Sequence, residues 1–425
     1  MKCIALAVAV LLVVCHVGFT YPTNDKVSYQ GYKVFNLNIE NENQRNFLID
    51  FIENNNAGVS IWHQDFNSMD ILVDPKTQMY FHNATMARGF RLKEVISNLQ
   101  SLIDEEKPYE GDDSDEFNWT RYYELEDIYK FLDDILAKYP KVTEPFTIAQ
   151  SYEGRTVRGI KISLKEGNPG IYIESNIHAR EWITSATATW FINELLTSTD
   201  PEVRNLVENY DWYIVPVLNV DGFTYSHNKD RLWRKTRQPV AHSTCIGTDG
   251  NRNFDSYWMV NGASSNPCAS DYAGPQANSE PEIKGESEFL SANKDKFNIL
   301  LAFHCYSQML LSPYGHTLEL PPNNDDLEKV ADAYAKAVIN MPYKTEYTYG
   351  TSAGAMYYAP GSTIDFAYNE ADIKITYTIE MRDTGLHGFV LPPTHILPNC
   401  KETMAGIVAL VKEAQNLGYM KPKYL

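Results

Sequence analysis

The sequence predicts an α/β protein: a mixed, mainly parallel sheet with helices on both faces, preceded by a small α/β open sandwich. Two observations lead to this prediction. After residue 117, segments with strand character alternate with segments of helical periodicity, which is typical of parallel sheets. Before residue 107, a shorter strand and helix pattern stands by itself, and the acidic Pro/Gly segment "KPYEGDDSDE" follows it. We therefore expect two folded units joined by an exposed linker.

Residues 1–20 have the features of a secretory signal peptide. Lys2 gives a positive start, and the apolar run "CIALAVAVLLVV" is too short to span a bilayer. Cleavage is expected near residues 15–20, and the alternative is an uncleaved anchor. Because no later run has 18 consecutive apolar residues, no membrane partner is expected. The expected location is therefore extracellular.

Residues 21–116 are expected to form a small domain and its linker. The patterns predict strands at 32–39, 59–65 and 70–74 and helices at 43–53 and 92–106. The last helix is predicted because apolar residues recur at helical spacing from Leu92 to Ile103. A small secreted domain that ends in an acidic joint suggests a segment that an activating protease removes.

Residues 117–425 show a longer alternation of elements. The patterns predict helices at 122–140 and 185–197 and strands at 157–163, 170–175, 211–219, 297–304 and 374–380. In sheets of this kind, ligand sites gather at the C-terminal ends of the strands. His178 follows one predicted strand and His304 ends another. We therefore expect the functional site at this edge of the sheet.

Charge and cysteine content limit the possible partners and crosslinks. The net charge of −18 at pH 7 argues against a nucleic-acid partner, because phosphates would be repelled. Outside the expected signal peptide the cysteines are Cys245, Cys268, Cys305 and Cys400. Four cysteines allow three sets of pairs, and we favour a disulfide between Cys245 and Cys268, which bracket a loop-like stretch.

Three ionisable residues stand at the ends of two predicted strands. His178 and Glu181, in "NIHAREWITSA", are three positions apart, so both side chains can lie on one side of a turn. His304 would complete a His/Glu/His set with a fourth position open for water, which is the arrangement of a catalytic zinc site. The alternative for the first two residues is an ion pair in an exposed turn. The strand-end positions and the second histidine weaken that alternative, and the rest of the chain decides between the two.

Seven further stretches carry a resemblance that covers nearly the whole chain. They are "SYEGR" (151–155), "HAREWI" (178–183), "DRLWRKTR" (230–237), "NRNFD" (251–255), "FHCYSQ" (303–308), "IDFAYN" (364–369) and "IEMRDTGLHGF" (379–389). In this order and spacing they resemble the secreted pancreatic-type zinc carboxypeptidases of the A/B group, which are made as proenzymes. "NLQSLIDEE" is similar to the last helix of that family's pro-domain. The resemblance implies a pro-domain and linker at 21–116 and a catalytic domain at 117–425.

The resemblance also implies the catalytic residues. One Zn²⁺ ion per chain would be held by His178, Glu181 and His304. Glu380, which ends the predicted strand 374–380, would be the general base, although a glutamate at a strand end is otherwise a common surface residue. Arg234 would stabilise the developing oxyanion, because fixed positive charge is needed there.

Substrate binding is implied for a second group of residues. Arg252 would bind the free C-terminal carboxylate of a peptide or protein with help from Asn251 and Tyr357, because a guanidinium fork matches a carboxylate. Arg180 and Tyr306 would contact the substrate further along. The implied partners are peptide substrates, an activating protease and protein inhibitors.

Ile364 stands at the position that resembles the base of the family's specificity pocket. An acid there marks enzymes that take Lys or Arg, so Ile364 implies aliphatic and aromatic C-terminal residues. Ser352 departs from the apolar pattern of the pocket, and Cys305 stands where serine is usual and is interpreted as a spectator or an oxidation-sensitive thiol. The alternative within this class of enzyme is a broad or B-type specificity. The alternatives to an enzyme are a non-catalytic peptide-binding protein and a carbohydrate or adhesion module. The first would be favoured by loss of Glu380 or a ligand, and all are present.

Overall fold

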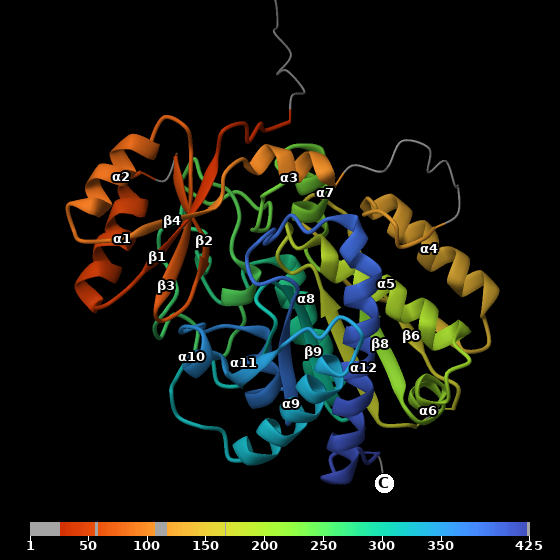
Figure 1. Ribbon diagram of the computed structural model, residues 1–425. Helices are drawn as coiled ribbons and strands as arrows, with labels where there is room; N and C mark the ends of the chain where they lie inside the picture. Colours follow the sequence, from red (N-terminus) through yellow and green to blue (C-terminus); the bar gives the residue numbers. More distant parts are fainter. Residues whose placement is uncertain (1–25, 56–57, 107–116, 166, 423–425) are drawn as a thin grey trace, which may run out of the picture.

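The structure is a computed structural model that describes residues 26–55, 58–106, 117–165 and 167–422. The expected signal peptide and the acidic linker lie outside the described residues. A smaller N-terminal domain sits over one edge of a larger domain whose sheet is flanked by helices (Figure 1). Among the described residues, no helix is both long and apolar enough to cross a membrane.

The N-terminal domain is an antiparallel sheet with two helices on its outer face (Figure 1). The strand order is β2-β3-β1-β4. Its elements are β1 (Lys33–Asn38), α1 (Glu42–Asn54), β2 (Val59–Gln64), β3 (Ser68–Val73), α2 (Gln78–Met86), β4 (Leu92–Ile96) and α3 (Leu99–Glu105). Side chains from alternate strand positions face different cores: Ile71 packs against the helices, whereas Trp62 and Leu72 belong to the core shared with the larger domain. The sheet therefore joins two cores.

The prediction of a helix at 92–106 is wrong for the first half of that segment. Residues Leu92–Ile96 form β4, which pairs with β1 at the sheet edge, and only Leu99–Glu105 are helical. Leu92, Val95 and Ile96 fit helical spacing, but the open edge of β1 offers hydrogen bonds along a whole strand. Asn98 then stands at the N-cap position of the helix, where asparagine is favoured.

The larger domain is built on an eight-stranded sheet with the order β11-β10-β12-β9-β7-β8-β6-β5. The strands are β5 (Thr143–Gln150), β6 (Thr156–Ile162), β7 (Gly170–Ser175), β8 (Asp211–Val215), β9 (Phe297–Cys305), β10 (Met309–Ser312), β11 (Thr348–Thr351) and β12 (Ile375–Met381). The four central strands β12, β9, β7 and β8 are parallel. The antiparallel pairs lie toward the edges. This confirms a mixed, mainly parallel sheet.

Helices cover both faces of this sheet, as predicted. They are α4 (Leu125–Lys138), α5 (Trp182–Thr197), α6 (Pro201–Asn209), α7 (Val220–Asn228), α8 (Pro281–Ala292), α9 (Asn324–Ile339), α10 (Ser352–Ala355), α11 (Thr363–Asn369) and α12 (Ile396–Asn416). Every residue of β7 and β9 is buried, which explains their mainly apolar character. Ile171 and Ile173 face the core with α5, α9 and α12, and Tyr172 faces the core with α7, α8 and α11.

The predicted disulfide is confirmed. Cys245 and Cys268 are bonded, with their Cα atoms 5.2 Å apart. Cys305 and Cys400 are buried and form no disulfide. Burial raises the pKa of the Cys305 thiol well above its usual value, which favours the spectator interpretation.

Candidate active site

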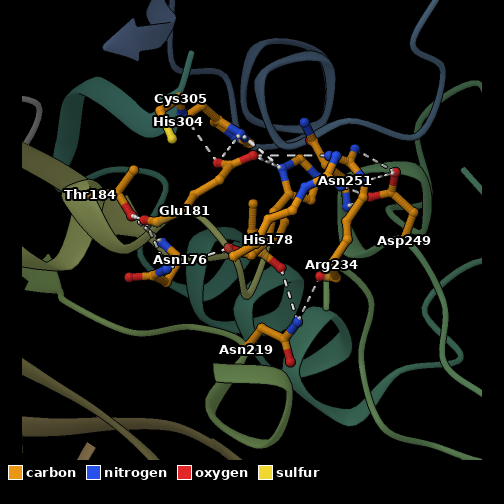
Figure 2. A network of polar contacts seen from close by, with 12 residues as sticks. Asn176, His178, Glu181, Thr184, Asn219, Arg234, Asp249, Asn251, His304 and Cys305 are labelled. Carbon is orange, nitrogen blue, oxygen red and sulfur yellow. Dashed lines mark hydrogen bonds and ion pairs between the residues drawn. The ribbon is translucent and has the colours of Figure 1, made fainter. Parts of the chain in front are cut away.

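Two neighbouring strands bring three ionisable side chains together. His178 follows the end of β7, Glu181 stands at the N-cap of α5, and His304 is the penultimate residue of β9. Because β7 and β9 are adjacent and parallel, their C-terminal ends meet at one edge of the sheet. Candidate ligand atoms of the three residues lie within 4.8 Å of one another (Figure 2).

The donor atoms of this triad fit a zinc ion. His178 Nδ1 lies 3.2 Å from His304 Nδ1 and 2.8 Å from Glu181 Oε1. Zinc bonded tetrahedrally to two imidazoles at about 2.0–2.1 Å would hold the two nitrogens about 3.3 Å apart. The imidazole and carboxylate donors are those zinc prefers, and all three are buried. The geometry is that of a three-ligand site.

Asp249 is a functional residue that the sequence analysis missed. Its Oδ1 lies 3.1 Å from His178 Nε2, the ring nitrogen that points away from the ligand cluster (Figure 2). Its Oδ2 accepts from Arg234 Nη2 at 2.8 Å. Burial alone would raise the pKa of Asp249, but Arg234 and His178 hold it well below the usual range. A carboxylate in this place fixes the ring orientation of the ligand histidine. The available signal was an acid directly before "GNRNFD".

Glu380 faces the triad from β12, the neighbour of β9 on its other side. It is in register with His304 and lines the same cavity. Burial raises the pKa of the Glu380 carboxyl to about 8. A cation bound by the triad would lower this pKa, because positive charge favours the carboxylate. Arg234 reaches the other side of the cluster, with Nη1 3.9 Å from Glu181 Oε1.

Most of the predicted residues line one cavity. This group is His178, Arg180, Glu181, Arg234, Asn251, Arg252, His304, Tyr306, Tyr357 and Glu380. The guanidinium of Arg252 lies 5.6 Å from the ring centre of Tyr357. Ile364 does not line the cavity. Its side chain is 2% exposed and belongs to α11, where it packs in the core that also contains residues of α7 and α8.

Comparison with known proteins matches these features. Residues 128–406 match the family "Zinc carboxypeptidase", and residues 35–106 match "Carboxypeptidase activation peptide". The chain belongs to the zinc carboxypeptidase family. A "Zinc carboxypeptidase" of Simulium vittatum is 48% identical over 70% of this chain and 98% of its own length. "Carboxypeptidase A1" of Bos taurus is 38% identical over 78% of this chain and 80% of its own.

Solved structures agree with this assignment. Thrombin activatable fibrinolysis inhibitor has 29% identity and a TM-score of 0.82, covering 90% of this chain and 98% of its own. Carboxypeptidase A from Helicoverpa armigera has a TM-score of 0.83 at 24% identity over 93% of this chain and 100% of its own, which shows the shared fold. The protein is therefore a zinc metallocarboxypeptidase zymogen, and the resemblance, the enzyme class and the zinc cofactor expected from the sequence are confirmed.

The activation peptide covers the zinc carboxypeptidase site directly. Residues 61–64 of β2 line the same cavity as the zinc ligands. The ring of His63 stacks on Tyr306 with centroids 5.0 Å apart, and Tyr306 Oη donates to Asp70 Oδ2 at 3.2 Å. Trp62 contacts Phe389 edge to face. These contacts place the activation peptide in the cavity that the zinc ligands line.

A buried ion pair joins the end of the activation peptide to the catalytic domain. Arg231 Nε and Nη2 donate to the two oxygens of Glu106 at 2.6 and 2.7 Å. The Arg231 side chain is 7% exposed and its guanidinium lies 3.6 Å from the ring centre of Trp182. It also donates to the carbonyls of Arg180 and Phe389, at 2.8 Å each. Glu106 thus binds a guanidinium that also contacts two cavity-lining residues.

Proposed function

We propose that the mature enzyme is a secreted exopeptidase that hydrolyses the C-terminal peptide bond of peptides and proteins, with a preference for aliphatic or aromatic C-terminal residues. The observation that supports this proposal is the meeting of a zinc triad, an additional carboxyl and three arginines in one cavity. The triad and Glu380 provide the means of hydrolysis. The arginines can recognise a carboxylate, which an exopeptidase must do.

The catalytic roles follow from position. Bound zinc supplies Lewis acidity, which acidifies water and polarises the scissile carbonyl. Glu380 accepts the proton of the attacking water and returns it to the leaving amine. Arg234, held by Asp249, faces the oxygen on which negative charge develops. Because Arg234 is already fixed by that ion pair, little reorganisation is needed during the reaction.

The free carboxylate of the substrate would be bound by Arg252 and Asn251. Asn251 Oδ1 accepts the Thr363 N–H at 3.0 Å, so its Nδ2 group is the part that can donate to a ligand. Arg252 is 2% exposed, and its Nη1 is anchored on the Asn251 carbonyl at 2.7 Å. Tyr357 stands beside Arg252 and would close over the ligand. Arg180 and Tyr306 would contact the preceding residues of the peptide.

The proposed preference rests on the resemblance, which implies Ile364 as the apolar base of the specificity pocket, although its side chain lies in the core and does not line the cavity described above. The side chain of a C-terminal Phe, Tyr or Leu gains roughly 1.5–3 kcal/mol by burial there. Lys or Arg would bring a charge with no carboxylate on Ile364 to pair with it, and such burial costs several kcal/mol. Ser352 is buried and adds a hydroxyl, which cannot neutralise a charge.

The processing steps belong to the same proposal. The signal peptide at 1–20 directs secretion, and an activating protease separates 21–116 from 117–425 by cleavage in or near the linker. Lys107 precedes Pro108, a poor bond for trypsin, so Arg91, Lys93 or Arg121 or a different protease are the alternatives. N-terminal sequencing of the active form identifies the bond. Protein inhibitors that occupy the carboxylate site are further expected partners.

The decisive experiment uses the secreted proenzyme. The chain is activated by limited trypsin digestion and assayed on peptides that differ only in the C-terminal residue, with and without a chelator. We expect release of Phe, Tyr and Leu, loss of activity with the chelator and recovery with added Zn²⁺. Full activity of a verified metal-free sample would contradict zinc catalysis. Full activity of the intact secreted chain would contradict the zymogen role.

A further inference from the structure

Two buried carboxyl groups lie behind the substrate cavity and have no part in the reaction described above. Glu174 is on β7 and Glu286 is on α8, and the side chains face each other across the core. Their residues are 1% and 0% exposed. Carboxyl groups are rarely this buried unless a partner compensates for the lost hydration.

The partners available are too few for two carboxylates. Tyr172 Oη donates to Glu286 Oε1 at 2.7 Å. Glu286 Oε2 and both carboxyl oxygens of Glu174 are buried without a well-formed hydrogen bond. Two negative charges so close in a low-dielectric core repel strongly, and such pairs keep a shared proton. The arrangement therefore favours one neutral carboxyl that donates to the other.

Glu174 is also linked to the substrate site. Besides Glu286, its carboxyl faces the hydroxyl of Thr363, the first residue of α11. The backbone N–H of Thr363 donates to Asn251 Oδ1 at 3.0 Å. Thr363 is fully buried, so a displacement of its side chain is transmitted to its backbone. The chain of contacts runs from Glu286 through Glu174 and Thr363 to Asn251.

We propose that Glu174 and Glu286 form a proton-sharing carboxyl pair that positions Asn251 for the terminal carboxylate of the substrate. The proposal rests on the proposed role of Asn251. Loss of the shared proton would push the two side chains apart, displace Thr363 and weaken substrate binding, while the hydrolytic groups keep their places. Both residues are thus positioning residues.

The direction in which stability changes with pH follows from the carboxyl group of the pair that stays protonated. Burial raises the pKa of Glu286 well above its ordinary value, and the Glu174 carboxyl raises it further, whereas the Tyr172 hydroxyl lowers it. Burial likewise raises the pKa of Glu174, and His304 lowers it. Among the described residues, Tyr172 and His304 are the other titratable groups that act on the pair. The folded state thus holds a proton that the unfolded chain releases near the ordinary pKa. Stability falls as pH rises from that value through the folded pKa.

The test compares the activated wild-type enzyme with Glu286→Gln on one C-terminal Phe peptide from pH 6 to 10. The amide keeps the hydrogen bond from Tyr172 and donates to Glu174 at every pH. We expect the wild-type KM to rise several-fold toward alkaline pH, with kcat following the same pH profile in both proteins. The KM of Glu286→Gln should stay flat over this range. The melting temperature of the variant should also fall less with pH.

Glu288→Gln is the matched control, because Glu288 is on the exposed face of the same helix. It should follow the wild type in every measurement. Parallel KM and melting profiles for wild type and Glu286→Gln would overturn the proposal, although normal activity in both would leave the proposed function intact. If Glu286→Gln does not fold, the same measurement on Tyr172→Phe tests the proposal. It removes a donor to the carboxylate, so the alkaline rise in KM should move upward by about one pH unit. An unmoved profile would overturn the proposal.

Discussion

At the scale of single residues, the site separates groups that hold metal from groups that move protons. His178, Glu181 and His304 come from positions fixed by β7, α5 and β9, and two of the ligands, His178 and Glu181, have a further hydrogen bond outside the triad. Cys305 N, for example, donates to Glu181 Oε2 at 3.3 Å. Glu380 has no role in holding the triad, so its carboxyl can exchange a proton. This division predicts different outcomes for substitutions that lie a few ångströms apart.

Glu380→Gln should keep zinc and lose turnover. The amide has nearly the same shape but cannot accept the proton of the attacking water. General-base contributions are about 10²–10⁴-fold, so kcat should fall by that factor. Metal content, measured by atomic absorption, should stay at one zinc per chain. Turnover close to that of the wild type would remove Glu380 from its proposed role.

Ile364→Asp should narrow or invert the preference between apolar and basic C-terminal residues. In the wild type we expect Phe-ended peptides to exceed Arg-ended ones by at least about 10²-fold in kcat/KM, which corresponds to a charge penalty of about 3 kcal/mol. The new carboxylate would pair with a basic side chain and remove this penalty. Equal rates of the native enzyme on both peptides would show that Ile364 is not the pocket base.

At the scale of elements, strands were easier to predict than the residues between them. β7 and β9 are fully buried and mainly apolar, so their pattern in the sequence locates them, and with them His178 and His304. The segment 92–106 was harder, because the pairing of β4 with β1 overrides its helical spacing. Only its place directly before "GNRNFD" pointed to Asp249, because it lies in a loop before a short 3₁₀ turn and its importance depends on two partners that are distant in the sequence.

Asp249→Asn should weaken zinc binding without preventing folding. An asparagine keeps the shape but loses the negative charge that orients His178 and holds Arg234. Loss of such a partner typically costs 10–100-fold in metal affinity or activity, so we expect a change of about this size. Competition with a chromophoric chelator measures the affinity. Asp255→Asn, a change at an exposed position of the same loop, should bind zinc like the wild type.

At the scale of the whole molecule, one domain inhibits the other by occupying the same cavity. The activation peptide uses β2 to cover the zinc ligands and Glu106 to bind Arg231. The second contact is made at the last described residue before the linker, so cleavage within the linker leaves it intact. The two fragments of a chain cut there should therefore remain associated, and the appearance of activity should lag behind cleavage.

Glu106→Gln should shorten this lag. The amide leaves the buried Arg231 without a counter-charge, and removal of one partner of a buried ion pair costs about 3–5 kcal/mol. Every 1.4 kcal/mol is tenfold, so the cleaved peptide should bind about 10²–10⁴-fold more weakly. Parallel gel and activity time courses measure the interval between cleavage and activity. Glu105→Gln, at an exposed neighbour, should behave like the wild type. An unchanged lag in Glu106→Gln would assign retention of the cleaved peptide to the β2 contacts with Tyr306 and Phe389 instead.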